Sequence, residues 1–185
     1  MFPFKRRPVL LLAASVGLVA TVALGSAVAA LRLQAATTLS GRAVTAVKVV
    51  SDAAESSTLS STFMDIPGAT VTIKVPAATQ ALLLVRFSGE SRCDISFPAT
   101  CAVRVLVNGV EAQPSRGIAS AFDSAPGTGP PTQVVLRQSH SIDRSAGPLG
   151  PGSYTVDVQY AISFEGGGSS FRLQDWSLTV DRAKV

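Results

Sequence analysis

The sequence predicts an all-β protein, an antiparallel β-sandwich of jelly-roll type preceded by an N-terminal hydrophobic helix. Three observations support this. Apolar and polar residues alternate along short segments, turn residues separate these segments, and no segment after residue 35 has a helical period. Fifteen glycines and eleven prolines fit a chain rich in turns. With 185 residues, 46% of them apolar and 15% charged, the chain can bury a core.

Residues 1–30 predict export from the cytoplasm. Three basic residues at positions 5–7 precede a run without charge over positions 9–31, which is how a chain enters the export machinery. Cleavage as a signal peptide is favoured by the small residues Ala27 and Ala29, and retention as an N-terminal membrane anchor is favoured by the length of the run. A buried helix of a cytosolic fold is the third alternative. Either export route places the remaining chain in the cell envelope or outside the cell.

Residues 31–60 are rich in Ala, Ser and Thr and predict a spacer that could contribute one strand, AVTAVKVV. Residues 61–185 are expected to form the sandwich domain. The net charge of +4 comes mostly from the basic residues at positions 5–7, and no basic run follows them. Nucleic acid is therefore not expected as a partner, and membrane contact is expected only through the N-terminal segment.

Residues 61–112 predict two strands and a hairpin. In GATVTIKVPA and ALLLVRFSG every second residue is apolar, so each strand should bury one face, with a turn at 76–80. In CAVRVLVNGVEAQ the alternation ends at Asn108-Gly109, a pair that accepts the positive φ angles of a tight hairpin turn. The predicted core positions are Val71, Ile73, Val75, Leu83, Val85, Phe87, Val103, Val105 and Val107.

Residues 117–180 predict further strands. GIASAFDS should place Ile118, Ser120 and Phe122 on one face, and alternation continues over 134–142. The later strands predict core positions at Tyr154, Val156, Val158, Tyr160 and Ile162, then at Phe171 and Leu173, and with opposite parity at Trp176, Leu178 and Val180. One extra residue near Gln174-Asp175, a β-bulge, would bring these last five into one core.

The two cysteines, Cys93 and Cys101, are expected to form a disulfide in an oxidising compartment, with free thiols or redox chemistry as the alternatives. A zinc site would need further ligands, and His140 is the only histidine. No metal or other cofactor is therefore predicted. Phe97 stands between the cysteines among polar residues and is the candidate for an exposed contact with a partner.

No catalytic residue is predicted, so the chain is not expected to be an enzyme. The segment SHSIDR brings Ser, His and Asp together, but on a strand His140 points away from Ser139, Ser141 and Asp143, which excludes a triad from neighbours in sequence. Carboxylates such as Asp65, Asp157 and Asp181 fall on outward positions. A hydrolase that uses scattered carboxylates would need two of them to meet in space.

The segments TFMDIPGATVTIKVPA, VRVLVNGVEA, LGPGSYTVDVQY and WSLTVDRAKV resemble exported bacterial jelly-roll domains, which are similar to the C1q and tumour-necrosis-factor superfamily. The resemblance covers about residues 60–185 and lies in the rhythm of the strands. It implies a compact sandwich that forms homo-oligomers, specifically trimers, and presents loops to a partner. It supplies no catalytic residues.

The sequence thus favours an exported or membrane-anchored non-enzymatic module for recognition or structure at the cell surface. Its partner would be a protein, a glycan or another copy of the chain. The alternative is a secreted carbohydrate-active protein, either a binding module or a hydrolase.

Overall fold

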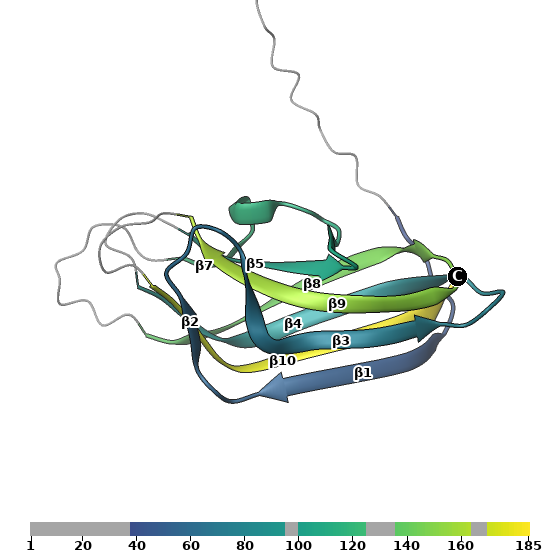
Figure 1. Ribbon diagram of the computed structural model, residues 1–185, viewed down its shortest axis with the longest axis horizontal. Helices are drawn as coiled ribbons and strands as arrows, with labels where there is room; N and C mark the ends of the chain where they lie inside the picture. Colours follow the sequence, from purple (N-terminus) through teal and green to yellow (C-terminus); the bar gives the residue numbers. More distant parts are fainter. Residues whose placement is uncertain (1–37, 95–99, 125–135, 164–169) are drawn as a thin grey trace, which may run out of the picture. The chain divides into compact units, whose positions relative to one another are not determined.

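The computed structural model describes residues 38–94, 100–124, 136–163 and 170–185. Within these residues the chain forms ten strands and one short 3-10 helix, and the strands make two antiparallel sheets. The sheets face each other, with β10, β4 and β8 in one layer and β3, β9 and β5 in the other (Figure 1). The predicted fold class is confirmed as an all-β sandwich. The predicted N-terminal hydrophobic helix lies outside the described residues.

Each sheet has five strands. The first sheet has the order β1-β10-β4-β8, with β2 also paired to β10, and its strands are β1 (Val44–Asp52), β2 (Ser56–Thr58), β4 (Ala81–Asp94), β8 (Gln138–Leu149) and β10 (Ser170–Lys184). The second has the order β3-β9-β5-β6, with β7 also paired to β5, and its strands are β3 (Met64–Val75), β5 (Thr100–Val107), β6 (Val110–Glu111), β7 (Ala121–Ser124) and β9 (Gly152–Ile162). The 3-10 helix η1 (Gly117–Ala119) lies between β6 and β7 in sequence.

The segment 31–60 contributes two strands to the first sheet. The strand that AVTAVKVV could form is β1, which pairs antiparallel with β10, and β2 pairs with the other half of β10. Ala46 and Val50 of β1 pack against the core, whereas Val47 and Val49 are exposed on the other face. The second half of the Ala/Ser/Thr-rich segment is therefore part of the sandwich edge.

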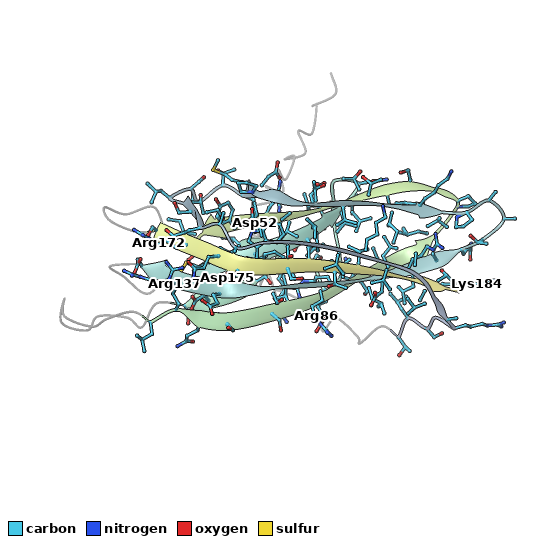
Figure 2. The ribbon with its side chains drawn as sticks, turned by 90° about the horizontal axis from the view of Figure 1, so that it is seen from below. Asp52, Arg86, Arg137, Arg172, Asp175 and Lys184 are labelled. Carbon is cyan, nitrogen blue, oxygen red and sulfur yellow. A yellow bond between two sulfur atoms is a disulfide. The ribbon has the colours of Figure 1, made fainter. Side chains whose placement is uncertain are left out.

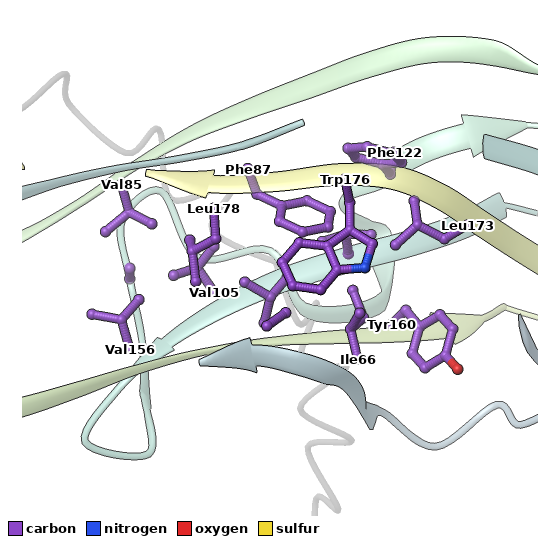
Figure 3. Close-up of a cluster of buried hydrophobic side chains, with 14 of the residues drawn as sticks. Ile66, Val85, Phe87, Val105, Phe122, Val156, Tyr160, Leu173, Trp176 and Leu178 are labelled. Carbon is purple, nitrogen blue, oxygen red and sulfur yellow. The ribbon is translucent and has the colours of Figure 1, made fainter. Parts of the chain in front are cut away.

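The core lies between the sheets and follows the predicted alternation. Phe87, Val105 and Val156 reach it from three strands, and Trp176 lies among them (Figure 3). Each side chain predicted to be buried between positions 71 and 107 is at most 6% exposed. The Asn108-Gly109 turn has φ angles of 48° and 79°, and β6 returns alongside β5 as expected. Among the core positions predicted in β9 and β10, Tyr154 is the exception: it is half-buried near the start of β9 and packs against the core.

The predicted β-bulge in β10 is present. The pairing of β10 with β4 shifts register between Gln174 and Ser177, and Asp175 has a φ of 46°. The extra residue turns the later half of the strand over, so the five apolar side chains of β10 named above are at most 2% exposed. Trp176 enters the core where β3 also shifts register, facing Gly68, whose φ is 76°.

Two strand starts were predicted too early. The strand expected from Gly117 begins only at Ala121, because Gly117 has a φ of 51° and Ser120 N–H donates to its carbonyl, which closes a 3-10 turn. Ile118 is consequently exposed, while Ser120 and Phe122 are buried as expected. β8 begins at Gln138, where its pairing with β4 begins; Leu136 is 70% exposed. Val134 lies outside the described residues.

Candidate functional site

The disulfide predicted between Cys93 and Cys101 is present and joins the two sheets. Cys93 is near the end of β4 and Cys101 is at the start of β5, with 5.8 Å between their Cα atoms. Both cysteines are fully buried, and no cysteine is free. This covalent link marks one end of the sandwich, which we call the disulfide end. Phe97, the predicted contact residue, lies outside the described residues.

His140 lies at the disulfide end and points into the sandwich, as the alternation along β8 requires. Ser139, Ser141 and Asp143 are exposed on the opposite face, so this part of the sequence forms no triad with His140. The residues that gather near His140 instead come from other strands. They are Ser91 of β4 and Asp123 of β7.

The order of these three side chains differs from that of a hydrolase triad. Ser91 Oγ donates to Asp123 Oδ2 at 2.7 Å, and His140 Nε2 lies 3.7 Å from Asp123 Oδ1, which is beyond hydrogen-bond length. In a triad the imidazole lies between serine and carboxylate and takes the serine proton. Here the carboxylate lies between them, and Ser91 is 1% exposed. The hydrogen bond therefore ties β4 to β7 beside His140 of β8, and the cluster offers no accessible nucleophile.

A cavity opens beside this cluster, which we call the polar cavity. Its volume is about 410 Å³. The imidazole of His140 packs against the Phe122 ring, with 5.5 Å between the ring centroids. In the part of the chain that the structure describes, the buried His140 Nε2 atom has no hydrogen-bond partner. The lining thus combines an aromatic base with donors and acceptors, and it comprises Ala121, Phe122, Asp123, Ser124, Gln138 and His140.

Ion pairs connect the strands on the outside of the disulfide end. Glu55 accepts hydrogen bonds from Arg137 and Arg172, and Arg172 Nε also lies 3.7 Å from a carboxylate oxygen of Asp94. Asp94 forms a second pair with Arg92 at 2.6 Å. Figure 2 shows Arg137 and Arg172 at the same end of the sheet, far from Lys184. We call these five charged residues the ion-pair cluster.

The arginines of the ion-pair cluster change the acidity of Glu55. The hydrogen bond from Arg137 is the main cause that lowers the pKa of the Glu55 carboxyl below its ordinary value of 4.5, and the charges of Arg137 and Arg172 add to it. Glu55 therefore stays ionised as the pH falls below that value. The cluster carries three positive charges and two negative ones, and the carboxylate of Asp123 at the same end balances the third arginine.

The inward face of β8 carries one more charged group, Arg144. Its guanidinium donates to Ser120 Oγ at 2.6 Å and to the carbonyl of Asp143 at 2.9 Å. Burial is the main cause that lowers the pKa of Arg144, and the charge of Glu111 opposes this. Sequence reasoning identified neither Arg144 nor Asp123 and Ser91 as neighbours of a site. Alternation puts Ser91 and Arg144 on the inward faces of their strands. Asp123 follows the inward Phe122 and reaches the same side only through the register shift of β7 against β5, so strand pairing is needed to bring these residues together.

The predicted outward carboxylates belong to the sheet surfaces. Asp65 accepts a hydrogen bond from Gln159 at 2.7 Å, and Asp157 accepts one from Thr70 at 2.6 Å. Of three cavities lined by described residues, none has two carboxylates in its lining. Among the described residues no group of three His, Cys, Asp or Glu side chains could hold a metal ion.

The predictions for the N-terminal segment, including those for Ala27 and Ala29, concern residues outside the described ranges. Among the described residues no helix has the length and apolar composition needed to span a membrane.

Comparisons with known proteins give no family. No family model and no curated protein matches the chain. Among solved structures, the dimeric latent PorU from Porphyromonas gingivalis matches with a TM-score of 0.40 and 13% sequence identity. The match covers 80% of this chain but only 14% of that chain.

Proposed function

We propose that this protein is an exported or membrane-anchored, non-enzymatic β-sandwich that recognises a polar partner at the cell surface through its disulfide end. The partner is a protein, a glycan or a second copy of the chain. The polar cavity carries the proposal, because Gln138 and His140 line it together with Phe122 at the disulfide end, where the imidazole packs against the phenyl ring.

The disulfide end supports recognition because its side chains are already held in place. Asp123 is fixed by hydrogen bonds from Ser91 Oγ and from the N–H of Ser124. The Cys93–Cys101 link and the ion-pair cluster restrain the strands around it. A site with restrained side chains loses less conformational entropy on binding, so more of the contact energy remains as affinity.

The hydrolase alternative has less support from the same geometry. Glycoside hydrolysis uses two carboxyl groups on opposite sides of the scissile bond. The polar cavity has one carboxylate, Asp123, which already accepts two hydrogen bonds. A carbohydrate-binding module needs no such pair, and the aromatic base with amide and imidazole groups is compatible with a sugar ligand.

The resemblance to the C1q and tumour-necrosis-factor superfamily stays a prediction. Its specific consequence is a trimer, and sedimentation equilibrium of the exported protein measures this directly. A trimer would make a second copy of the chain one of its partners, while a monomer at all concentrations would remove that expectation.

Binding by wild type and matched variants tests the proposed function. The double variant Gln138→Ala/His140→Ala removes the two polar side chains that β8 contributes to the cavity. Ser139→Ala/Ser141→Ala changes the exposed face of the same strand. On glycan arrays and on intact cells, the first variant should bind at least tenfold more weakly and the second should bind like wild type. Equal binding by both variants would contradict the proposal. Sugar release by the wild type that Asp123→Asn abolishes would establish the hydrolase instead.

A further inference from the structure

A second cavity lies at the other end of β8, and it is largely apolar. Its volume is about 380 Å³. Val107 and Ala112 are buried in its lining, and Ala146, Leu149 and Tyr154 pack against the hydrophobic core. The apolar cavity is therefore continuous with the core of the sandwich.

The cavity exists because one edge of the sandwich is incompletely closed. β6 has only two residues, after which the chain crosses to the first sheet. There the backbones of Gln113 and Ser145 form two hydrogen bonds of 2.8 Å, the only bridge outside the named strands in the described part of the chain. The space beside the bridge is unfilled because the side chains of Ala112 and Ala146 are small. Gly147 packs so closely against Ala81 and Leu82 that it has no room for a side chain.

The polar groups around the apolar cavity already have partners. Tyr154 Oη donates to the carbonyl of Gly150 at 3.0 Å. Asn108 Oδ1 accepts from the N–H of Thr155 at 2.8 Å, and Glu111 Oε1 accepts from the N–H groups of Arg116 and Gly117. A polar group on a ligand would lose its bound water on entering this cavity, and the polar groups there already have partners. Such a group would therefore add little to the affinity.

We propose that the apolar cavity is a binding site for a small, uncharged, apolar molecule such as a medium-length alkyl chain or an aromatic ring. Its volume lies in the range of small-molecule sites, about 300–1,000 Å³. Glu111 is the charged residue in its lining, so its carboxylate repels anions and the site discriminates against ligands with an acidic head. This site is independent of the disulfide end and goes beyond the proposed function.

The inference also follows from the energetics of the cavity. Apolar side chains that line an open cavity keep surface in contact with water, and a ligand or a larger side chain would cover that surface. A variant that fills the space should therefore gain stability and lose ligand at the same time. If the substitution instead disrupted the fold, both the stability and the ligand binding would fall. A filled cavity and a disrupted fold therefore give opposite changes in stability.

Titration with three ligands that share one alkyl tail tests the proposal. 1-Octanol, octanoate and octylamine would be added to the isotopically labelled full chain, and NMR shifts of Ala146, Leu149 and Tyr154 would be followed. Octanol should bind and shift these three residues, and octanoate should bind at least tenfold more weakly. No saturable shift with any ligand, or shifts confined to other residues, would overturn the proposal.

Two leucine variants of the same strand supply the control. Ala146→Leu should fill the cavity, raise the melting temperature and weaken octanol binding at least tenfold. Ser139→Leu adds the same side chain on the exposed face of β8 and should bind octanol like wild type.

If Ala146→Leu lowers the melting temperature, Ala112→Val fills less of the same space and takes its place. Wild-type octanol affinity in a folded filled variant would overturn the inference. Gln138→Ala/His140→Ala should keep octanol binding, which separates this site from the disulfide end.

Discussion

The two ends of β8 contact the second sheet in different ways. At the disulfide end, His140 of β8 packs on Phe122 of β7 beside the hydrogen bond between Ser91 and Asp123, and a disulfide joins β4 to β5. At the other end, β8 meets the second sheet through one backbone bridge at Ser145 and leaves an apolar cavity. The first end is held by side-chain hydrogen bonds and a disulfide, and the second by one backbone bridge and the core.

This difference shows how one strand can carry two kinds of binding surface. Directional bonds fix polar side chains in a cavity and so favour recognition of a polar partner. Small side chains beside a short strand leave apolar space, which favours an apolar ligand. The core between the two ends supports both, so perturbing the core and each end separately should give different results.

The largest expected effect is that of Trp176→Ala, which removes the core side chain between the two ends. Trp176 is 2% exposed and stacks on Phe87, with 6.1 Å between ring centroids. Truncating a buried aromatic ring costs about 3–5 kcal/mol of unfolding free energy. Urea unfolding followed by circular dichroism measures this, since Trp176 is the only tryptophan and its fluorescence is lost with it. A cost below about 1 kcal/mol would contradict the core position of this residue.

Replacing both cysteines by alanine tests the covalent tie of the disulfide end. Cys93→Ala/Cys101→Ala frees a loop with a sequence separation of 8 residues, which costs roughly 2.6 kcal/mol in the chain-entropy account. Both positions are fully buried, so alanine adds no polar group to the core. Denaturation of the variant and of reduced wild type should agree. Hydrogen exchange should accelerate in β5 next to Cys101 more than at Ser145, and uniform acceleration would contradict the separation of the two ends.

Ser91→Ala tests the polar contact that fixes Asp123. The Ser91 hydroxyl is buried and donates to the carboxylate at 2.7 Å, so its removal should cost about 1–3 kcal/mol. Ser88 lies on the same strand and faces outward, so Ser88→Ala should change the unfolding free energy by less than about 0.5 kcal/mol. Equal effects of the two variants in urea unfolding would mean that the Ser91–Asp123 contact does not hold this end together.

Much of the fold could be predicted from the sequence because a strand with one buried face has apolar residues at every second position. Val71, Val85 and Val105 were placed in the core correctly, and the parity change before Trp176 predicted the bulge in β10. The 3-10 turn was missed because its positive φ at Gly117 has no periodic signal.

The candidate sites were harder to predict, because they depend on which strands become neighbours. Nothing in the local sequence links Asp123 to Ser91, since the two lie 32 positions apart and on different sheets. The apolar cavity beside Ala146 is open because β6 is only two residues long. Spacing along one strand carries no information on either arrangement. The disulfide was predictable because the expected export to an oxidising compartment and the short separation of the two cysteines favoured their pairing.

The smallest expected effect concerns the pH dependence of the disulfide end. Because the pKa of Glu55 is lowered in the folded protein, its ion pairs contribute stability above pH 4.5, and that contribution is lost as the pH falls through the lowered pKa. Arg137→Gln removes the main cause, so the pKa of Glu55 should rise toward 4.5 while Arg172 keeps part of the shift. Carboxyl NMR titration measures this change.

The control is Arg86→Gln, which breaks a separate exposed pair with Asp143 and should leave the pKa of Glu55 unchanged. A pKa that is the same in all three proteins would mean that Arg137 does not hold Glu55 in solution, and the ion-pair cluster would then add nothing to the rigidity of the disulfide end.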